Sequence, residues 1–165
     1  MFETAEEIEQ LQALMDRSYA AMNAHMADIV APERRLTAAR VCNYLQNVKH
    51  VSFATVNTHS EPLVAPLDGW FIHGRFIVST GAGALRVRHI EANPAVSLAH
   101  VDGDEIGIWA HGTARRLQPE EPLAQEWDRA ATAFYSSSPS GWGDIAAFVV
   151  EPRKMFGYAM DPAKF

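Results

Sequence analysis

The chain has 165 residues, of which 48% are hydrophobic and 21% are charged, and its formal net charge is −6. This composition is typical of one globular domain and excludes a disordered chain, because disordered chains are poorer in apolar residues. The negative net charge argues against nucleic acid as a partner, so any attraction for a phosphate group must be local.

Cysteine usage and the N-terminal sequence indicate the compartment. Cys42 is the only cysteine, which excludes an internal disulfide and a multi-cysteine zinc site. No apolar run approaches the ~18 residues that a membrane span needs. The first ten residues, MFETAEEIEQ, lack the basic start and the apolar stretch of a secretory signal. We therefore expect a cytoplasmic protein with no membrane partner.

Residues 1–36 are expected to form an N-terminal helical arm. From Glu6 to about Asp28, apolar residues recur every three or four positions, which predicts one amphipathic helix. Pro32 cannot continue this helix. The apolar stripe consists of Ile8, Leu11, Met15, Tyr19, Met22 and Met26.

Residues 37–165 are expected to form one domain, which begins with a short helix. Thr37 is a candidate N-cap, and Val41, Leu45 and Val48 lie on one face of the helix that would follow.

After His50, short β-rich segments alternate with turn residues. Pro66 indicates a sheet edge or a bulge, and the dipeptide His73-Gly74 indicates a tight hairpin. The expected strands are 51–56, 63–72, 75–80, 95–101, 106–117, 145–152 and 155–160, and the expected helices are 84–92 and 118–135. This order of short antiparallel strands predicts a barrel or a sandwich with flanking helices.

The segment RFIVSTGAGALRVRHI, residues 75–90, is a candidate phosphate site. Ser79 and Thr80 supply hydroxyl donors, and the glycines that follow allow a sharp turn and close approach of the backbone. Arg86 can bind a phosphate with two parallel hydrogen bonds. Arg88 lies two positions further along the helix, so both arginines cannot face one ligand, and we expect Arg86 to be the phosphate ligand. The residues alone are equally compatible with a solvated basic helix.

Other reactive side chains indicate no further site. His100 and His111 flank a turn of the sequence DGDE, and their spacing matches no familiar metal site. Cys42 falls on the apolar side of a helix and is expected to be a small buried hydrophobe. No serine lies in a nucleophile elbow, and no catalytic acid or base stands out. Trp142, in the loop 136–144, fits either a lid over a planar ligand or an ordinary exposed loop.

Four segments in register resemble the pyridoxamine 5′-phosphate oxidase-like family, the FMN-binding split barrels. They are ATVN with EPLVAP, GRF with ST, RVRHI with NPAVSL, and HGTAR. The resemblance covers roughly residues 45–117, and FVVEPRKMFGY fits the family's closing strands. It implies a mostly β protein with flanking helices, a split β-barrel to which the N-terminal arm is added.

The resemblance also implies a flavin-type oxidoreductase that transfers hydride between FMN, or the deazaflavin coenzyme F-420, and a small organic substrate. The phosphate would be held by Ser79, Thr80 and Arg86, with Arg88 at the rim. Relatives often have lysine in place of Arg86 and asparagine in place of His89. The cofactor ring would lie against the second strand of the domain, at Val64, Ala65, Pro66, Leu67 and Asp68.

Two subunits are expected to pair with the cofactor in their interface. Trp70 and Trp109 are candidate interface aromatics. The arm has two possible destinations, its own barrel or the partner subunit, where it would shield the cofactor, and of the two we favour the crossing. Near the C-terminus only Arg153 and Lys154 are basic, so oxidation of pyridoxamine phosphate itself is not expected. Two alternatives stay open: a haem-binding or haem-degrading split barrel with His100 or His111 as the ligand, and a cofactor-binding protein without turnover.

Overall fold

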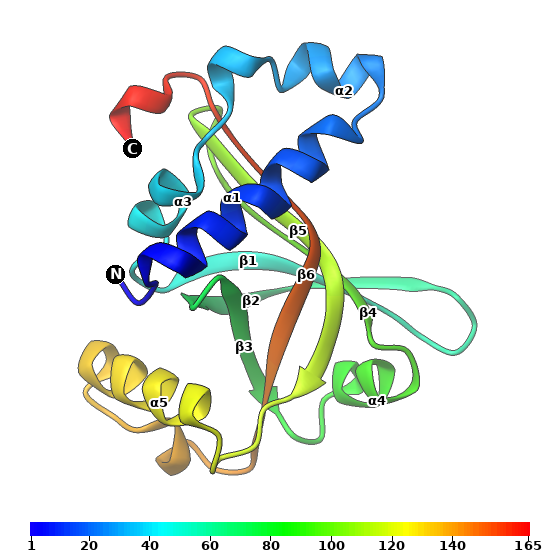
Figure 1. Ribbon diagram of the computed structural model, residues 1–165. Helices are drawn as coiled ribbons and strands as arrows, with labels where there is room; N and C mark the ends of the chain where they lie inside the picture. Colours follow the sequence, from blue (N-terminus) through cyan, green and yellow to red (C-terminus); the bar gives the residue numbers. More distant parts are fainter.

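The computed structural model describes residues 1–165 and contains one closed barrel of antiparallel strands (Figure 1). The strand order around the barrel is β1-β2-β3-β6-β5-β4, and this architecture confirms the predicted fold class. No helix is both long and apolar enough to cross a bilayer. The main elements are α1 (Ala5–Ala20), α2 (Ala24–Ile29), α3 (Ala38–Tyr44), β1 (Lys49–Val56), β2 (Pro62–Ile72), β3 (Arg75–Gly81), α4 (Leu85–Ala92), β4 (Ala95–Asp102), β5 (Ile106–Arg116), α5 (Pro122–Tyr135) and β6 (Ile145–Ala159).

β6 is one strand of 15 residues, so the prediction of two closing strands is wrong. Pro152 interrupts the hydrogen-bonding pattern, but the pairing with β5 shifts register between His111 and Gly112 and then continues. A Cβ at Gly112 would lie 2.1 Å from the Glu151 carbonyl oxygen, so only glycine fits opposite this bulge. The proline is thus accommodated inside a continuous strand.

The hairpin of β1 and β2 projects from the barrel (Figure 1). β1 pairs with β4 only over Ser52–Ala54, and β3 pairs only with the last four residues of β2, 69–72. The first part of β2, including Pro66, therefore has β1 as its only partner, which confirms the predicted sheet edge. The tight turn at His73-Gly74 is also confirmed, because both residues adopt positive φ angles of 52° and 73°.

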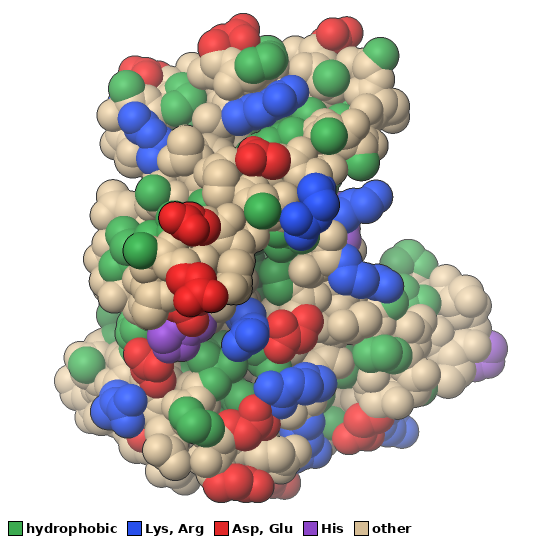
Figure 2. Space-filling view, viewed as in Figure 1, with side chains coloured by type: hydrophobic (Ala, Val, Ile, Leu, Met, Phe, Trp, Pro, Cys, Tyr) green, Lys and Arg blue, Asp and Glu red, His purple; other side chains and the backbone are tan.

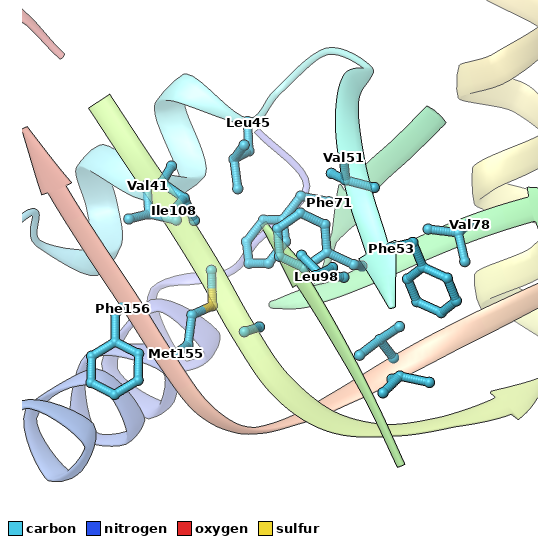
Figure 3. Close-up of a cluster of buried hydrophobic side chains, with 14 of the residues drawn as sticks. Val41, Leu45, Val51, Phe53, Phe71, Val78, Leu98, Ile108, Met155 and Phe156 are labelled. Atoms are coloured by element: carbon cyan, nitrogen blue, oxygen red, sulfur yellow. The ribbon is translucent and has the colours of Figure 1, made fainter. Parts of the chain in front are cut away.

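The main core fills the barrel and continues under α1 and α3. It contains 28 buried residues. Figure 3 shows Val41 of α3 and Leu45, the residue that follows this helix, beside side chains of the barrel strands such as Ile108. Thr37 caps α3 by accepting a hydrogen bond from the Arg40 N–H, as predicted. Cys42 is buried and unpaired, and burial raises the pKa of its thiol to about 12, so it behaves as the expected small hydrophobe.

A second, smaller core lies between the barrel and α5. Trp70 of β2 is 5% exposed within it, and its ring packs edge-on against Phe134 and Tyr135. Trp70 is therefore buried by its own chain, and the expectation that it serves as an interface aromatic is wrong. Trp109 differs, because it is half-buried on the outer side of the barrel, where it stacks on Phe156.

The arm contains two helices, α1 and α2, where the sequence predicts one. The break falls at residues 21–23, where Asn23 caps α2 by accepting a hydrogen bond from the Met26 N–H. Asparagine favours such capping positions over helix interiors, because its short side chain bonds to nearby backbone groups. The apolar stripe is thereby divided, and its first part covers β6.

α1 packs on its own barrel rather than across to a partner. Leu11 and Met15 are buried in the main core. The Tyr19 hydroxyl donates to the Gly157 carbonyl at 2.8 Å and accepts from the Gly157 N–H at 3.1 Å. Burial raises the pKa of this hydroxyl to about 12. The expectation of a crossing arm is wrong, because the stripe finds its apolar partner in β6 of the same chain.

His73 joins α1 to α5. Its Nδ1 lies 3.0 Å from the Glu7 carboxylate of α1, and its Nε2 lies 2.8 Å from the Glu126 carboxylate of α5. Arg75, on the adjacent strand, is paired with Glu151 at 2.9 Å. Charged side chains of both signs are interspersed on this face (Figure 2). Burial alone lowers the pKa of His73, but the two carboxylates outweigh it and raise the pKa above its usual value.

The raised pKa of His73 predicts a pH-dependent contribution to stability. That contribution is complete below the unfolded-state pKa of about 6.5 and is lost as the pH rises through the folded-state value. His73→Asn, which tolerates the left-handed backbone, should therefore lower the free energy of unfolding more at about pH 5.5 than at about pH 9. Urea unfolding of both proteins at the two pH values measures this. An equal loss at both would contradict the prediction.

Candidate functional site

A pocket of about 250 Å³ lies between the projecting hairpin and α4; we call it the α4 pocket. Three elements supply its walls: the end of β1, the start of β2, and the first turns of α4. Its mouth is apolar, since the side chains of Leu63, Val64 and Leu85 are 42%, 68% and 56% exposed. The lining residues are Phe53, Thr55, Leu63, Val64, Ala65, Ala84, Leu85, Arg86 and His89.

Arg86 is the cationic group of this pocket. Its guanidinium donates a hydrogen bond to the Thr80 hydroxyl at the end of β3. α4 holds the arginine in place because Val87 and Ile90 anchor the helix in the main core. No side chain caps the N-terminus of α4. A cation, a hydroxyl and the start of a helix therefore meet at one point, and this donor set suits an anion.

The glycines of this turn are not required by its backbone. Neither Gly81 nor Gly83 has a positive φ angle, and a Cβ on either would meet no atom within 4 Å. The predicted need for conformational freedom is therefore wrong. What the two glycines provide is open space beside the start of α4.

The two arginines of α4 line different hollows, as their spacing predicts. Arg88 lines a depression of about 320 Å³ together with Asn57, Thr58 and His59 of the hairpin turn. Arg88 is absent from the walls of the α4 pocket. Of the two, only Arg86 contacts Thr80.

Ser79 and Thr80 are not brought together. Alternate residues of a strand face opposite sides, and Val78 of β3 belongs to the barrel core while Ile77 belongs to the core under α5. Thr80 therefore shares the barrel side with Val78, next to Arg86. Ser79 lies on the α5 side, opposite Ala147 of β6.

The predicted ring-binding segment of β2 is divided between two surroundings. Val64 and Ala65 line the α4 pocket, whereas Leu67 packs against the barrel core. Asp68 accepts a hydrogen bond from the Tyr135 hydroxyl of α5, and its other oxygen lies 3.3 Å from His50 Nε2. Burial and the Asp68 carboxylate raise the pKa of Tyr135. Pro66 lies between the two groups on the sheet edge.

Trp142 lies on the Asp68 side of this segment. Its ring packs edge-on against Tyr135, with ring centroids 5.1 Å apart, and its indole N–H donates to the Ser137 hydroxyl. The indole is 38% exposed. Trp142 is therefore held in the aromatic group that covers Asp68.

Sequence reasoning missed two polar residues of the α4 pocket, Thr55 and His89. The Thr55 hydroxyl lies 3.2 Å from His89 Nδ1, so the two side chains form one wall beside Arg86. His89 follows Arg86 by three positions, which places both on one face of α4. That spacing was a usable signal. The sequence contains no comparable signal for Thr55, because only the tertiary structure brings β1 next to α4.

The two histidines considered as haem ligands differ in availability. His100 is 9% exposed and both of its ring nitrogens have partners, the His50 carbonyl and the Tyr44 hydroxyl. His111 is exposed, and only its Nδ1 is engaged, at 2.8 Å from the Ser97 hydroxyl. Burial, and then Lys154, lower the pKa of His111, so its ring is neutral at neutral pH. No three metal-ligating side chains gather anywhere in the chain.

Comparisons with known proteins place this architecture in a family. Residues 37–158 match the family model for pyridoxamine 5′-phosphate oxidase. None of the curated proteins matches the chain.

Solved structures share the fold at low sequence identity. The conserved hypothetical protein Rv2991 from Mycobacterium tuberculosis has a TM-score of 0.68 and 16% identity, over 81% of this chain and 91% of that one. A protein named F420 reductase has a TM-score of 0.56 and 20% identity, over 69% and 94%. HutZ, a haem storage protein from Vibrio cholerae, has a TM-score of 0.58 and 17% identity, over 73% and 92%. At these identities the similarity establishes the fold alone.

Proposed function

Because this chain belongs to the pyridoxamine 5′-phosphate oxidase family, we propose that it binds FMN and acts as an oxidoreductase on a small organic substrate. The deazaflavin coenzyme F-420 is the second candidate cofactor, and the structural similarity to an F420 reductase favours keeping it. Either group, when bound, would supply hydride transfer, and the protein would supply position, electrostatics and water exclusion.

One observation carries the proposal: the Arg86 guanidinium bonds to the Thr80 hydroxyl at the wall of the α4 pocket. A phosphate fits this donor set, because a guanidinium offers two parallel N–H donors and the start of α4 lacks a side-chain cap. The Thr80 hydroxyl accepts from the guanidinium and holds it at the pocket wall.

The start of β2 is suited to orient a ring. This part of the strand has β1 as its only partner, so alternate backbone N–H and C=O groups on its other edge are free to bond a polar ring edge. The exposed side chains of Leu63, Val64 and Leu85 would exclude water from one side of the bound group. The α4 pocket thus combines a group of anion-binding donors with a free sheet edge.

We also propose that a second copy of the chain completes this site. α1 lies against β6 and α5 lies against β2, β3 and β6, whereas no helix packs on the outer side of β4. That side carries Val101, which is 65% exposed, and Trp109 of β5 lies half-buried beside it. The same outer side of the sheet continues from β4 across β1 to Val64 of β2, at the mouth of the α4 pocket. No helix covers this face, and its apolar side chains lie among Ser52, Ser97 and His111. Such a mixture is compatible with a dimer interface, because interfaces combine apolar and polar side chains.

Absorption spectroscopy and light scattering of the freshly purified protein test both proposals. We expect a flavin spectrum, or FMN binding on titration, and a mass of two chains at micromolar concentration. A deazaflavin spectrum would select the second cofactor and keep the proposed reaction. A protein that binds neither group would contradict the oxidoreductase proposal, and a cofactor-loaded monomer would contradict the dimer.

Haem binding is the competing function, and it is favoured by His111, an exposed residue whose Nε2 has no hydrogen-bond partner. The structural similarity to a haem storage protein adds support. Haem would give a Soret band that His111→Ala abolishes. His100 offers no free nitrogen for this role.

A further inference from the structure

The His73 side chain is placed so that each of its ring nitrogens faces a carboxylate. Nδ1 lies 3.0 Å from Glu7 Oε2 of α1, and Nε2 lies 2.8 Å from Glu126 Oε2 of α5. A protonated imidazole has an N–H on each nitrogen, whereas a neutral imidazole has one N–H and one lone pair. With a neutral ring, one carboxylate would therefore face a lone pair, and that contact would be repulsive. Both contacts are favourable only while the ring carries two protons.

A neutral His73 would keep Glu126 and lose Glu7. The contact with Glu126 is the shorter one, and Glu126 has no other hydrogen-bond donor in the protein. Glu7 Oε2 also accepts the Thr4 N–H at 2.8 Å, in the capping box that begins α1, so it has a donor without His73. A single proton on Nε2 leaves each carboxylate with a donor, whereas a single proton on Nδ1 would leave Glu126 with none. The lone pair of Nδ1 would then face Glu7.

The other charged groups around His73 do not contact its ring. They come from β3, β5, β6 and the segments before α1 and α5, and they are Glu3, Arg75, Arg115, Glu121 and Glu151. Each arginine of this group is paired with a glutamate of the group, at 2.9 and 2.8 Å. The proton on the ring is therefore held by the carboxylates of α1 and α5. Burial lowers the pKa of His73, but these two carboxylates outweigh burial and raise it.

The start of α1, which carries Glu7, covers Cys42 of α3. α1 begins beside α3, and the two helices are in contact (Figure 1). Cys42 is only 1% exposed. Burial, and then the carboxylates of Glu3 and Glu7, raise the pKa of its thiol to about 12, so both carboxylates lie close to the sulfur. Displacing the start of α1 would therefore open a path to the thiol.

We propose that His73 is a proton-dependent latch that holds the N-terminal segment, residues 1–8, over Cys42. With two protons on the ring, Glu7 is bound and the segment is closed. When the pH rises and Nδ1 loses its proton, Glu7 is released, and the segment opens as far as Leu11, which is anchored in the main core. The opening is local, so the barrel and α5 stay folded. None of these groups lines the α4 pocket, so the latch does not depend on the proposed cofactor.

The rate at which Cys42 reacts with uncharged 4,4′-dithiodipyridine measures the opening, because a covered thiol reacts only in the open state. Glu7→Gln is the matched variant, since an amide keeps the capping box and can either accept from the Nδ1–H or donate to its lone pair. The open-state thiol ionises equally in both proteins, so the ratio of their rates isolates the latch. The wild-type rate divided by the variant rate should rise roughly tenfold between about pH 5.5 and about pH 9. A constant ratio would overturn the proposal.

Two measurements on the wild type complete the test, and they decide if the variant does not fold. Nitrogen NMR of His73 at about pH 9 should show a neutral ring with its proton on Nε2, and a proton on Nδ1 would overturn the release of Glu7. The reaction rate at this pH should depend only weakly on low urea concentrations, because a local opening exposes little surface. A dependence as steep as that of global unfolding would show that Cys42 reacts only in the unfolded chain, and the latch would be rejected.

Discussion

Arg86→Glu is expected to weaken FMN binding more than about 100-fold, equivalent to about 3 kcal/mol. The substitution removes the guanidinium that lies against Thr80 at the wall of the α4 pocket. It also places a carboxylate where the phosphate would bind, so a charge-assisted bond is replaced by repulsion. Fluorescence titration of the purified variants with FMN measures the loss, and Arg86→Lys should recover most of the affinity.

Arg88→Glu is the matched control, because it makes the same change of charge on the same helix. Arg88 lines the hollow at the hairpin turn and not the α4 pocket, so its replacement should weaken binding less than about fivefold. Equal losses for both variants would show that α4 attracts the cofactor through its overall charge. Unchanged affinity in Arg86→Glu would remove this arginine from the site.

A truncated protein that begins at Leu36 is expected to lose about 5 kcal/mol or more of folding free energy. It lacks Leu11, Met15 and Tyr19, which are buried in the main core, and burial of each such side chain contributes about 1.5–3 kcal/mol. This loss is comparable to the whole stability of an ordinary domain. Urea unfolding monitored by circular dichroism should therefore show no cooperative transition at 25 °C.

Tyr19→Phe separates the hydrogen bonds of the arm from its apolar contacts. The variant keeps the ring that packs on Phe156 and removes the two bonds to Gly157, so we expect a loss of about 1–3 kcal/mol with cooperative unfolding preserved. A truncated protein as stable as the full chain would mean that the barrel core closes without α1.

The features that the sequence predicted correctly depend on near neighbours in the chain. Thr37 caps the helix that it precedes, and His73-Gly74 forms the tight turn of its hairpin. The two-residue spacing of Arg86 and Arg88 directs them into different hollows. Each follows from backbone geometry over a few residues, which a sequence pattern records directly. The split barrel was predicted in a different way, from the resemblance of four segments of the chain to a known family.

Other features were decided by contacts between segments far apart in the sequence. Periodicity shows that α1 has an apolar face, but only the tertiary structure shows that β6 of the same chain covers it. The sequence makes Trp70 a candidate interface aromatic, and only the structure shows that α5 buries it. Whether the indole N–H of Trp127 finds a hydrogen-bond partner likewise depends on what packs around α5. Thr55 joins His89 and Arg86 because the barrel brings β1 to α4. Burial and pairing at these sites depend on distant partners, because side-chain free energy is set by the atoms that surround each group and not by its neighbours in the chain.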